Sequence, residues 1–217
     1  MRASPPTGFL AFDYDGMLVD SLSANLEITN EVCVGLTGCR PVERSDIENL
    51  DRMSFQEIAE VLGIPSGDVG RCLEEINRRI VESYPGLDFF PGMEDVLRVL
   101  RGEGWDLYVV THNTEVAVAG FLEMKGARGW FSGLLGAETG GSKDAKLASL
   151  AESRGADPAV CAMFGDSVGD IESAKGAGVV SVGVSWGYQS RSRLLDADPD
   201  FIVDSPEGIL DVARGLR

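Results

Sequence analysis

Basic residues are scarce in this 217-residue chain. Nineteen lysines and arginines stand against 35 aspartates and glutamates, and the formal net charge is −16. Nucleic acids and anionic lipids are bound through basic surfaces, so neither is expected as a partner. An anionic substrate would need a local region of positive charge, which a bound divalent cation and a few lysines could provide.

Long apolar runs are also missing. No stretch approaches the roughly 20 residues that span a bilayer, and residues 1–7 lack the apolar segment of a signal peptide. We therefore expect a cytoplasmic protein with no membrane partner. The four cysteines form no CxxC pair, which favours reduced and mostly buried thiols.

The composition is that of a globular protein, without internal repeats or low-complexity segments. Hydrophobic residues make up 44% and charged residues 25% of the chain, so disorder is not indicated. A length of 217 residues fits one large domain, or a core domain that carries a smaller insertion. These features do not specify an oligomeric state.

The most informative stretch is FLAFDYDGMLVDS at residues 9–21. An apolar run of strand length leads into Asp13 and Asp15, and Gly16 begins a short turn. Alternation along a strand sends the Asp13 and Asp15 side chains to the same side, while Tyr14 points away. Two carboxylates this close repel each other in a dry pocket unless a cation or a shared proton relieves them. The pattern predicts a metal-dependent site at the carboxyl end of a strand.

The spacing of apolar residues divides the chain into two parts. Residues 18–88 are predicted to be helical, with capping boxes beginning at Ser45 and Ser54 and a further helix at 69–83. Helices and strands then alternate to the end of the chain. The predicted helices cover 93–103, 115–126, 143–154, 171–177 and 206–216, and the predicted later strands cover 107–110, 134–137, 161–164, 179–184 and 201–203.

This alternation predicts a doubly wound parallel sheet with right-handed crossovers. The expected fold class is α/β, a Rossmann-like core with an inserted all-helical cap domain. We expect the core domain to comprise residues 1–17 and 89–217, and the cap domain residues 18–88. Hinges near 17–21 and 89–92 would let the cap close over the site.

Polar residues follow three of the predicted strands. Asp13 and Asp15 follow the first, Thr111 follows the second, and Asp166 and Asp170 follow the fourth. Each has an ordinary explanation when taken alone, such as a surface acid pair or a helix cap. Because the carboxyl ends of parallel strands meet at one edge of a sheet, their order along one α/β chain predicts a single site.

With these residues in place, the sequence resembles the haloacid dehalogenase superfamily of phosphohydrolases, and within it the phosphoglycolate phosphatase-like branch with a helical cap. The resemblance covers nearly the whole chain. It rests on DYDGMLVDS at 13–21, PG at 91–92, VVTHN at 109–113, Lys143, GDSVGD at 165–170 and SVGVSWGY at 181–188. As a set these motifs are specific for the superfamily and much less specific for a substrate.

The resemblance implies a phosphatase acting on a small organic phosphate ester, and the residue types support that chemistry. Asp13 would attack phosphorus and form an aspartyl-phosphate. Asp15 would protonate the leaving oxygen and later deprotonate the attacking water. Mg²⁺ would be held by Asp13, Asp166 and the backbone carbonyl of Asp15. Thr111 would hydrogen-bond the phosphate, and Lys143 would neutralise its remaining charge.

Four further residues are expected to support this set, namely Gly16, His112, Asn113 and Asp170. The backbone N–H groups after Thr111 would contribute hydrogen bonds to the phosphate. Asp170 would act as an outer metal ligand through water, or would hold Lys143 in place.

The chain departs from the family's pattern at three places. Met17 stands where a threonine is usual, and His112, the only histidine, stands where a small polar residue is usual. The family's lysine is often followed by proline, whereas here both Lys143 and Lys146 are candidates. Lys143 directly follows Ser142, a good helix N-cap, and is the better candidate for the site.

Other chemistries of the same superfamily fit these residues less well. Dehalogenases need neither metal nor a second acid, so Asp15, Asp166 and Asp170 argue against them. Phosphonate-cleaving relatives use a cap lysine, and residues 18–88 contain none. A phosphoglucomutase-type phosphotransferase shares the core, but LDRMS at 50–54 only faintly matches its cap loop. A non-catalytic module that binds metal or a partner is disfavoured, because every expected catalytic group is present.

The resemblance alone suggests a candidate substrate. Phosphoglycolate is the leading candidate, and other small organophosphates, including nucleotides, stay open. Arg52 and Met53 are the candidate specificity residues of the cap.

Overall fold

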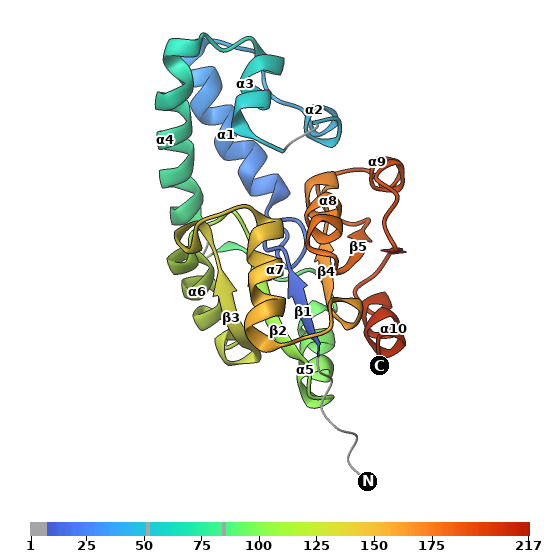
Figure 1. The fold of residues 1–217 in the computed structure, drawn as a ribbon. Helices are drawn as coiled ribbons and strands as arrows, with labels where there is room; N and C mark the ends of the chain where they lie inside the picture. Colours follow the sequence, from blue (N-terminus) through green and yellow to red (C-terminus); the bar gives the residue numbers. More distant parts are fainter. Residues whose placement is uncertain (1–7, 51–52, 84–85) are drawn as a thin grey trace.

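Six parallel strands form the centre of the molecule (Figure 1). This computed structural model describes residues 8–50, 53–83 and 86–217. The sheet order is β3-β2-β1-β4-β5-β6, and every neighbouring pair is parallel. The strands are β1 (Phe9–Phe12), β2 (Asp106–Val110), β3 (Phe131–Leu135), β4 (Ala162–Gly165), β5 (Val180–Val184) and β6 (Phe201–Val203). The predicted α/β class with a doubly wound parallel sheet is confirmed.

Strand β1 lies between β2 and β4, where the order of strands along the chain reverses. Its register places Phe12 beside Val109 and Phe164, and the N–H of Asp13 donates to the Phe164 carbonyl at 2.9 Å. The three strands therefore end at one edge of the sheet. In doubly wound sheets the reversal point at this edge is where ligands bind.

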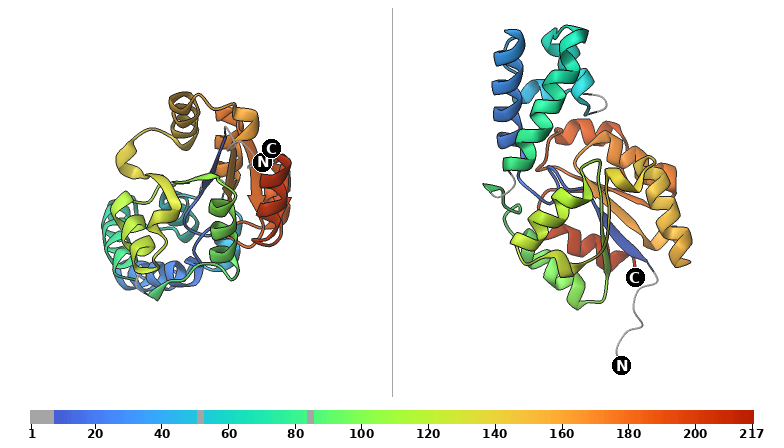
Figure 2. Two further views of the ribbon diagram at one scale, coloured as in Figure 1. Left: turned by 90° about the horizontal axis from the view of Figure 1, so that it is seen from below. Right: turned by 90° about the vertical axis from the view of Figure 1, so that its left-hand side faces the viewer.

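Helices cover both faces of the sheet (Figure 2). One layer contains α5 (Met93–Gly102), α6 (Glu115–Met124) and α10 (Gly208–Gly215), and the other contains α7 (Lys143–Arg154) and α8 (Val168–Ala177). Leu10 and Phe12 pack into the first layer, whereas Phe9 and Ala11 pack into the second. Because both faces of β1 are buried, its sequence is apolar throughout instead of alternating.

Four helices stand above the carboxyl edge of the sheet (Figure 1). They are α1 (Leu22–Thr37), α2 (Arg44–Glu48), α3 (Phe55–Leu62) and α4 (Ser66–Ser83), and we call them the cap. The cap has an apolar cluster of its own, in which Val32, Leu62 and Ile76 are buried. An inserted helical cap is as predicted, while domain limits at 17/18 and 88/89 stay a prediction.

The two chain segments that connect the cap to the sheet run side by side. Val19 and Phe89 form an antiparallel bridge. The N–H of Phe90 donates to the Leu18 carbonyl at 3.0 Å, and the N–H of Asp20 donates to the Asp88 carbonyl at 3.1 Å. Both predicted hinge segments therefore lie side by side and are joined by backbone hydrogen bonds at the base of the cap.

Some element boundaries differ from the predictions. Helix α2 is capped by Glu43, whose capping box with Asp46 replaces the one predicted from Ser45. Strand β3 begins three residues earlier than predicted, because Phe131 is buried against the core while a short 3-10 helix, Ala137–Thr139, follows Leu135. The short helix α9 (Arg191–Asp196) was not predicted, since six residues carry too little periodic signal. None of the described helices combines the length and hydrophobicity needed to cross a membrane.

Candidate active site

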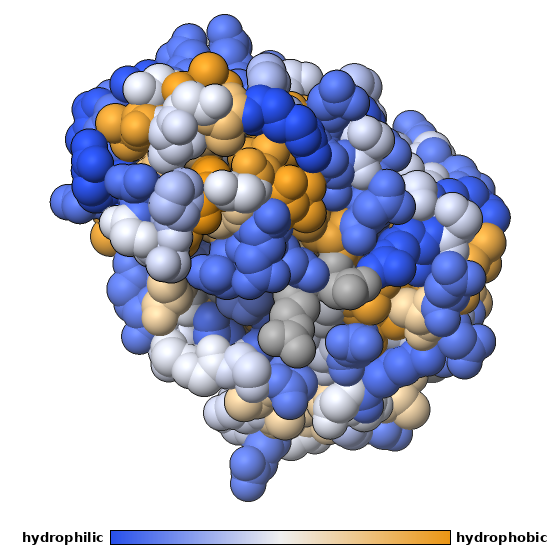
Figure 3. All heavy atoms as spheres, turned by 90° about the horizontal axis from the view of Figure 1, so that it is seen from above, coloured by the Kyte–Doolittle hydropathy of each residue, from blue (hydrophilic) through white to orange (hydrophobic). Residues whose placement is uncertain are grey.

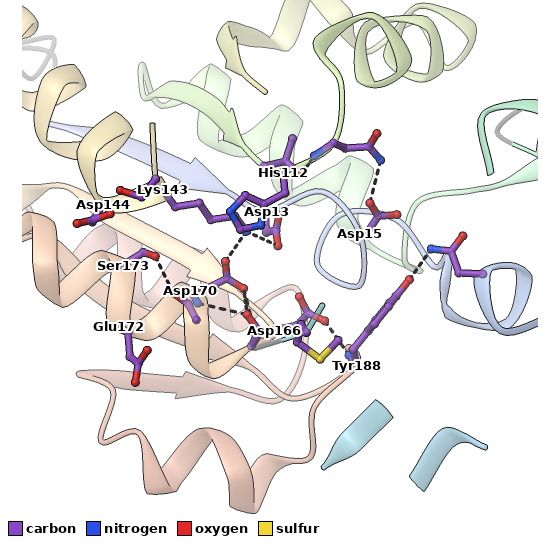
Figure 4. Close-up of a pocket in the computed structure, with 17 residues that line it drawn as sticks. Asp13, Asp15, His112, Lys143, Asp144, Asp166, Asp170, Glu172, Ser173 and Tyr188 are labelled. Carbon is purple, nitrogen blue, oxygen red and sulfur yellow. Dashed lines mark hydrogen bonds and ion pairs between the residues drawn. The ribbon is translucent and has the colours of Figure 1, made fainter. Parts of the chain in front are cut away.

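A cavity of about 610 Å³ opens at the carboxyl edge of the sheet, beneath the cap (Figure 4). The predicted residues that line it are Asp13, Asp15, Thr111, His112, Asn113, Lys143, Asp166 and Asp170. The cap contributes Asn25 and Met53, and the loop after β5 contributes Tyr188. Arg52, the other predicted specificity residue, lies outside the described residues.

Lys143 joins the carboxylates that follow β1 and β4. Its Nζ lies 2.7 Å from Asp13 Oδ2 and 2.6 Å from Asp170 Oδ1. The lysine is the first residue of α7, and its side chain is 5% exposed. Burial alone would lower the pKa of Lys143, but the Asp13 and Asp170 carboxylates outweigh it and raise the pKa. Lys143 therefore stays positively charged inside the site.

Lys146, the alternative lysine, has a different position one turn further along α7. Its Nζ donates to the backbone carbonyls of Thr111 at 3.2 Å and Gly136 at 2.6 Å. It holds together the loops that follow β2 and β3. Of the two candidates, Lys143 is the one that lines the cavity and contacts Asp13.

Three carboxylates are crowded around this single lysine. One oxygen each from Asp13, Asp166 and Asp170 lies within 4.8 Å of the others. Burial raises the pKa of Asp13 to about 6, against the opposing effect of Lys143. Burial, followed by the charges of Asp170 and Asp13, raises the pKa of Asp166 well above its usual range. When all three carboxylates are ionised, the cluster carries more negative charge than Lys143 neutralises.

Backbone packing holds Asp166 in this cluster. Its Oδ2 accepts a hydrogen bond from the N–H of Tyr188 at 2.7 Å. A Cβ at Gly16 would lie 2.1 Å from Asp166 Oδ2, and one at Gly187 would lie 2.2 Å from Asp166 Cβ, so only glycine fits at either position. A fixed set of oxygen donors with excess negative charge suits a hard divalent cation such as Mg²⁺. The donor set therefore fits the metal that the sequence predicts.

Asp15 occupies a separate corner of the cavity (Figure 4). Ser21 Oγ donates to its Oδ1 at 2.7 Å, and Asn113 Nδ2 donates to its Oδ2 at 3.0 Å. Burial raises the pKa of Asp15, although these two hydrogen bonds oppose the shift. Both oxygens of the carboxylate are thus held in place, one from the base of the cap and one from the loop after β2.

A chain of hydrogen bonds continues from Asp15 into the cap. Tyr188 Oη lies 2.9 Å from Ser21 Oγ, and Asn25 Nδ2 donates to Tyr188 Oη at 2.8 Å. Since the Ser21 hydroxyl already donates to Asp15, Tyr188 must donate to Ser21. Sequence reasoning assigned no role to Ser21, Asn25 or Tyr188. Ser21 and Tyr188 do fall within the matching stretches DYDGMLVDS and SVGVSWGY, but a contact across 167 residues has no local signal.

The three residues after β2, Thr111 to Asn113, make different contacts. Thr111 is buried, and its Oγ1 accepts a hydrogen bond from the Asn113 N–H at 3.1 Å. That N–H is therefore engaged within the loop, and the Asn113 side chain contacts Asp15. Burial and the charge of Lys143 lower the pKa of His112, so its imidazole is neutral at the cavity wall. A neutral ring at this position can donate or accept a hydrogen bond but adds no positive charge.

The loop after β5 connects this site to the cap at further points. Trp186 Nε1 donates to the Met17 carbonyl at 3.1 Å, and Gln189 Nε2 donates to the Leu50 carbonyl at 2.5 Å. Together with Tyr188, these side chains tie the residues around Asp166 to both the hinge and the cap. Met17 itself is fully buried, which explains why an apolar residue is accommodated where the family's pattern has threonine.

A family model and sequence relatives agree on the family to which this chain belongs. The family model for haloacid dehalogenase-like hydrolases matches residues 10–184. A phosphoglycolate phosphatase from Synechococcus elongatus is 30% identical, over 95% of this chain and 97% of its own length. A probable phosphatase from Dickeya dadantii is 29% identical, over 94% of this chain and 93% of its own length.

Solved structures share the fold. A predicted phosphoglycolate phosphatase from Haemophilus somnus superposes with a TM-score of 0.83 at 21% identity, covering 96% of this chain and 99% of that one. A phosphoglycolate phosphatase-like protein from Lactobacillus delbrueckii gives a TM-score of 0.82 at 20% identity, covering 96% and 98% of the two chains. At these identities the likeness concerns the fold.

Proposed function

Because the chain belongs to the haloacid dehalogenase-like hydrolase family, we propose that this phosphoric monoester hydrolase cleaves small organic phosphates with Mg²⁺ and through an aspartyl-phosphate. One observation carries the proposal. The Asp13 carboxylate lies in a cavity 2.7 Å from a buried lysine, beside two further carboxylates and near the separately held Asp15. The site therefore combines a nucleophile, a proton carrier and positive charge at the end of one strand.

Asp13 would act as the nucleophile. With a pKa of about 6, its carboxylate is mostly ionised at neutral pH. One oxygen would attack phosphorus, and the bond between phosphorus and the ester oxygen would break. The hydrogen bond from the Tyr14 N–H to Asp13 Oδ1, at 2.8 Å, orients the carboxylate for this attack.

Asp15 would carry the proton. Its raised pKa suits a group that gives a proton to the leaving oxygen and later takes one from water. In the second step that water would attack phosphorus, and the bond between phosphorus and Asp13 would break. The hydrogen bonds from Ser21 and Asn113 would keep Asp15 in position through both steps.

The remaining groups would hold the phosphate and the metal. Lys143, Thr111 and the backbone N–H of His112 would contact the phosphate oxygens. Gly16 has no side chain, so the backbone there can lie close to the Asp166 carboxylate. Asp13, Asp166 and the backbone carbonyl of Asp15 would bind Mg²⁺, with Asp170 acting through water or through Lys143. Bound Mg²⁺ would neutralise charge on the acidic cluster and on the phosphate.

Hydrolysis of p-nitrophenyl phosphate tests this function. We expect turnover that requires Mg²⁺ and is lost in Asp13→Asn, which removes the nucleophile with almost no change in size. Phosphoglycolate is the first natural ester to measure, because the Synechococcus elongatus relative bears that name. If the purified protein is inert with Mg²⁺ against a broad panel of phosphate esters, the proposal fails.

A further inference from the structure

A second cavity lies within the cap, next to the catalytic one. It has a volume of about 220 Å³ and lies between α1, α3 and α4. Most of its lining is apolar, including Leu26, Phe55, Ile58, Leu73 and Ile76. Figure 3, which looks down on this end of the molecule, shows hydrophobic side chains gathered within a mainly hydrophilic surface. We call this cavity the apolar groove.

The apolar groove adjoins the catalytic cavity. Asn25, Met53 and Tyr188 line both. Met53 also has a φ of 48°, a left-handed conformation that side-chain-bearing residues seldom adopt and that is concentrated at ligand clamps. A substrate whose phosphate lies at Asp13 would reach the groove by passing these three residues.

The charges around both cavities limit what such a molecule can be. Among the described lining residues the only lysine or arginine is Lys143, and Asp13 and Asp170 already bind it. The other charged side chains that line the catalytic cavity are acids, including Asp144 and Glu172. A second anionic group on the substrate would find no further lysine or arginine among these described residues, and it would face repulsion from these carboxylates. An uncharged, apolar group would instead leave water for an apolar surface.

We propose that the apolar groove is the binding site for the alcohol part of the substrate, and that the preferred substrates are phosphate monoesters of apolar alcohols. This inference rests on the proposed phosphatase function and names its substrate class. A cavity of about 150 Å³ lined by apolar side chains holds benzene, so 220 Å³ accommodates a ring or a short alkyl chain. Phosphoglycolate, which carries a carboxylate instead, would leave the groove unfilled.

A series of n-alkyl phosphates, from methyl to octyl, tests the proposal. Their alcohols have nearly equal pKa values, so the chemical step is constant and the chain length changes binding alone. We expect kcat/KM to rise up to about fourfold for each methylene that enters the groove, mainly through KM, and to level off once the groove is full. Phosphoglycolate should have a lower kcat/KM than hexyl phosphate. A flat or falling series, or phosphoglycolate as the best ester, would overturn the inference while leaving the phosphatase function intact.

Two matched variants show whether the groove causes the trend. Leu73 on α4 lines the groove and is 39% exposed, while Leu36 on α1 lines neither cavity and is 40% exposed. In Leu73→Trp the larger side chain takes up part of the groove, so KM for hexyl phosphate should rise about three- to tenfold while methyl phosphate is unaffected. Leu36→Trp should behave as the parent protein. Equal effects of the two substitutions would contradict the assignment.

Binding measurements separate this inference from the catalytic proposal. Methyl- and hexylphosphonate resist hydrolysis, so the thermal stabilisation that each gives at the same concentration with Mg²⁺ reports binding alone. If no ester is hydrolysed, the phosphatase function fails. The stabilisation by the two phosphonates then still tests whether the groove binds an apolar group. A larger shift with hexylphosphonate, reduced in Leu73→Trp, supports an apolar ligand site. Equal shifts overturn it.

Discussion

Tyr188 bonds Asp166 through its backbone and Ser21 through its side chain. The N–H lies 2.7 Å from Asp166 Oδ2, and the hydroxyl lies 2.9 Å from Ser21 Oγ, which in turn donates to Asp15. One residue of the core thus connects a predicted metal ligand with the predicted proton carrier. Its ring also packs against the apolar cluster of the cap. The position of the cap is therefore coupled to the orientation of Asp15.

Tyr188→Phe tests that coupling. The ring and its packing remain, but Ser21 loses the hydrogen bond that orients its hydroxyl toward Asp15. Since one such bond contributes about 1 kcal/mol, we expect kcat to fall about three- to tenfold, with KM for the phosphate ester nearly unchanged. Steady-state kinetics on p-nitrophenyl phosphate measure both constants.

The matched control for this change is Tyr108→Phe. Tyr108 is also buried, and its hydroxyl accepts a hydrogen bond at 2.8 Å from Arg154, at the opposite end of α7 from Lys143. This variant loses a hydrogen bond of the same kind without contacting the site. If both substitutions leave kcat equally unaffected, Tyr188 has a packing role only.

Lys143→Gln should nearly abolish turnover. The substitution keeps a hydrogen-bonding side chain but removes the positive charge between Asp13 and Asp170, and removing such a charge from a transition-state site costs about 10²-fold or more in kcat. Lys175→Gln is the control, because that lysine pairs with Asp198 on the exposed surface of α8. Activity in Lys143→Gln within tenfold of the parent would argue that Lys143 only balances charge in the resting protein.

The effect of Mg²⁺ on stability should depend on pH. Burial raises the pKa of folded Asp13 from 3.8 to about 6 and also raises that of Asp166. In the absence of metal, the folded state therefore holds protons that the unfolded state has released, and its stability falls as pH rises through about 6. Mg²⁺ must displace these protons to bind. We expect the Mg²⁺-induced rise in Tm to be several degrees at pH 7.5 and small at pH 5.

Thermal unfolding in EDTA and in excess Mg²⁺ at the two pH values measures this difference. The Asp166→Asn variant serves as the reference, because it removes one of the two carboxylates of the acidic cluster whose pKa is raised, with little change in volume. Its Tm in EDTA should exceed that of the parent at pH 7.5, and Mg²⁺ should shift it less. Equal Mg²⁺ shifts at pH 5 and pH 7.5 in the parent protein would contradict the assignment of the cluster as a metal site.

The sequence was sufficient to predict the sheet, the cap and the edge of the sheet at which the candidate residues gather, for identifiable physical reasons. A strand that is apolar on both faces, as at Phe9–Phe12, has to be a central strand between helical layers. The acids that follow such strands must then meet at one edge. Lys143 could be distinguished from Lys146 because it opens a helix, where the side chain lies nearest to the strand ends.

Other features could not be predicted, because they depend on contacts between distant parts of the chain. The hydrogen bonds that link Tyr188 with Ser21 and with Asn25 span more than 160 residues. The apolar groove arises from how three cap helices pack, and their amphipathic patterns predict burial without predicting an unfilled space. Gly187 is an ordinary turn residue in the sequence, and only its contact with Asp166 gives it a specific role.

Gly187→Ala should therefore impair the metal site. The added Cβ would lie 2.2 Å from Asp166 Cβ and 2.4 Å from its Oδ2, so either the loop or the carboxylate must move. Overpacking of this kind costs about 1–3 kcal/mol of stability. Because Tyr188 follows directly and bonds the same carboxylate, movement of the loop should also displace Asp166 from Asp13 and Asp170. We expect the Mg²⁺ concentration for half-maximal activity to rise about tenfold.

Gly120→Ala separates this local effect from the general effect of replacing a glycine. Gly120 lies within α6, and a Cβ there would have no atom within 4 Å outside its own helix backbone and chain neighbours. Alanine at a compatible helical position stabilises a protein by about 0.4–1 kcal/mol, so urea unfolding should show a small gain and the Mg²⁺ dependence should be unchanged. If Gly187→Ala retains the Mg²⁺ requirement of the parent within twofold, the loop yields without moving Asp166. In that case the close packing around Asp166 is a feature of stability and does not position the carboxylate for metal.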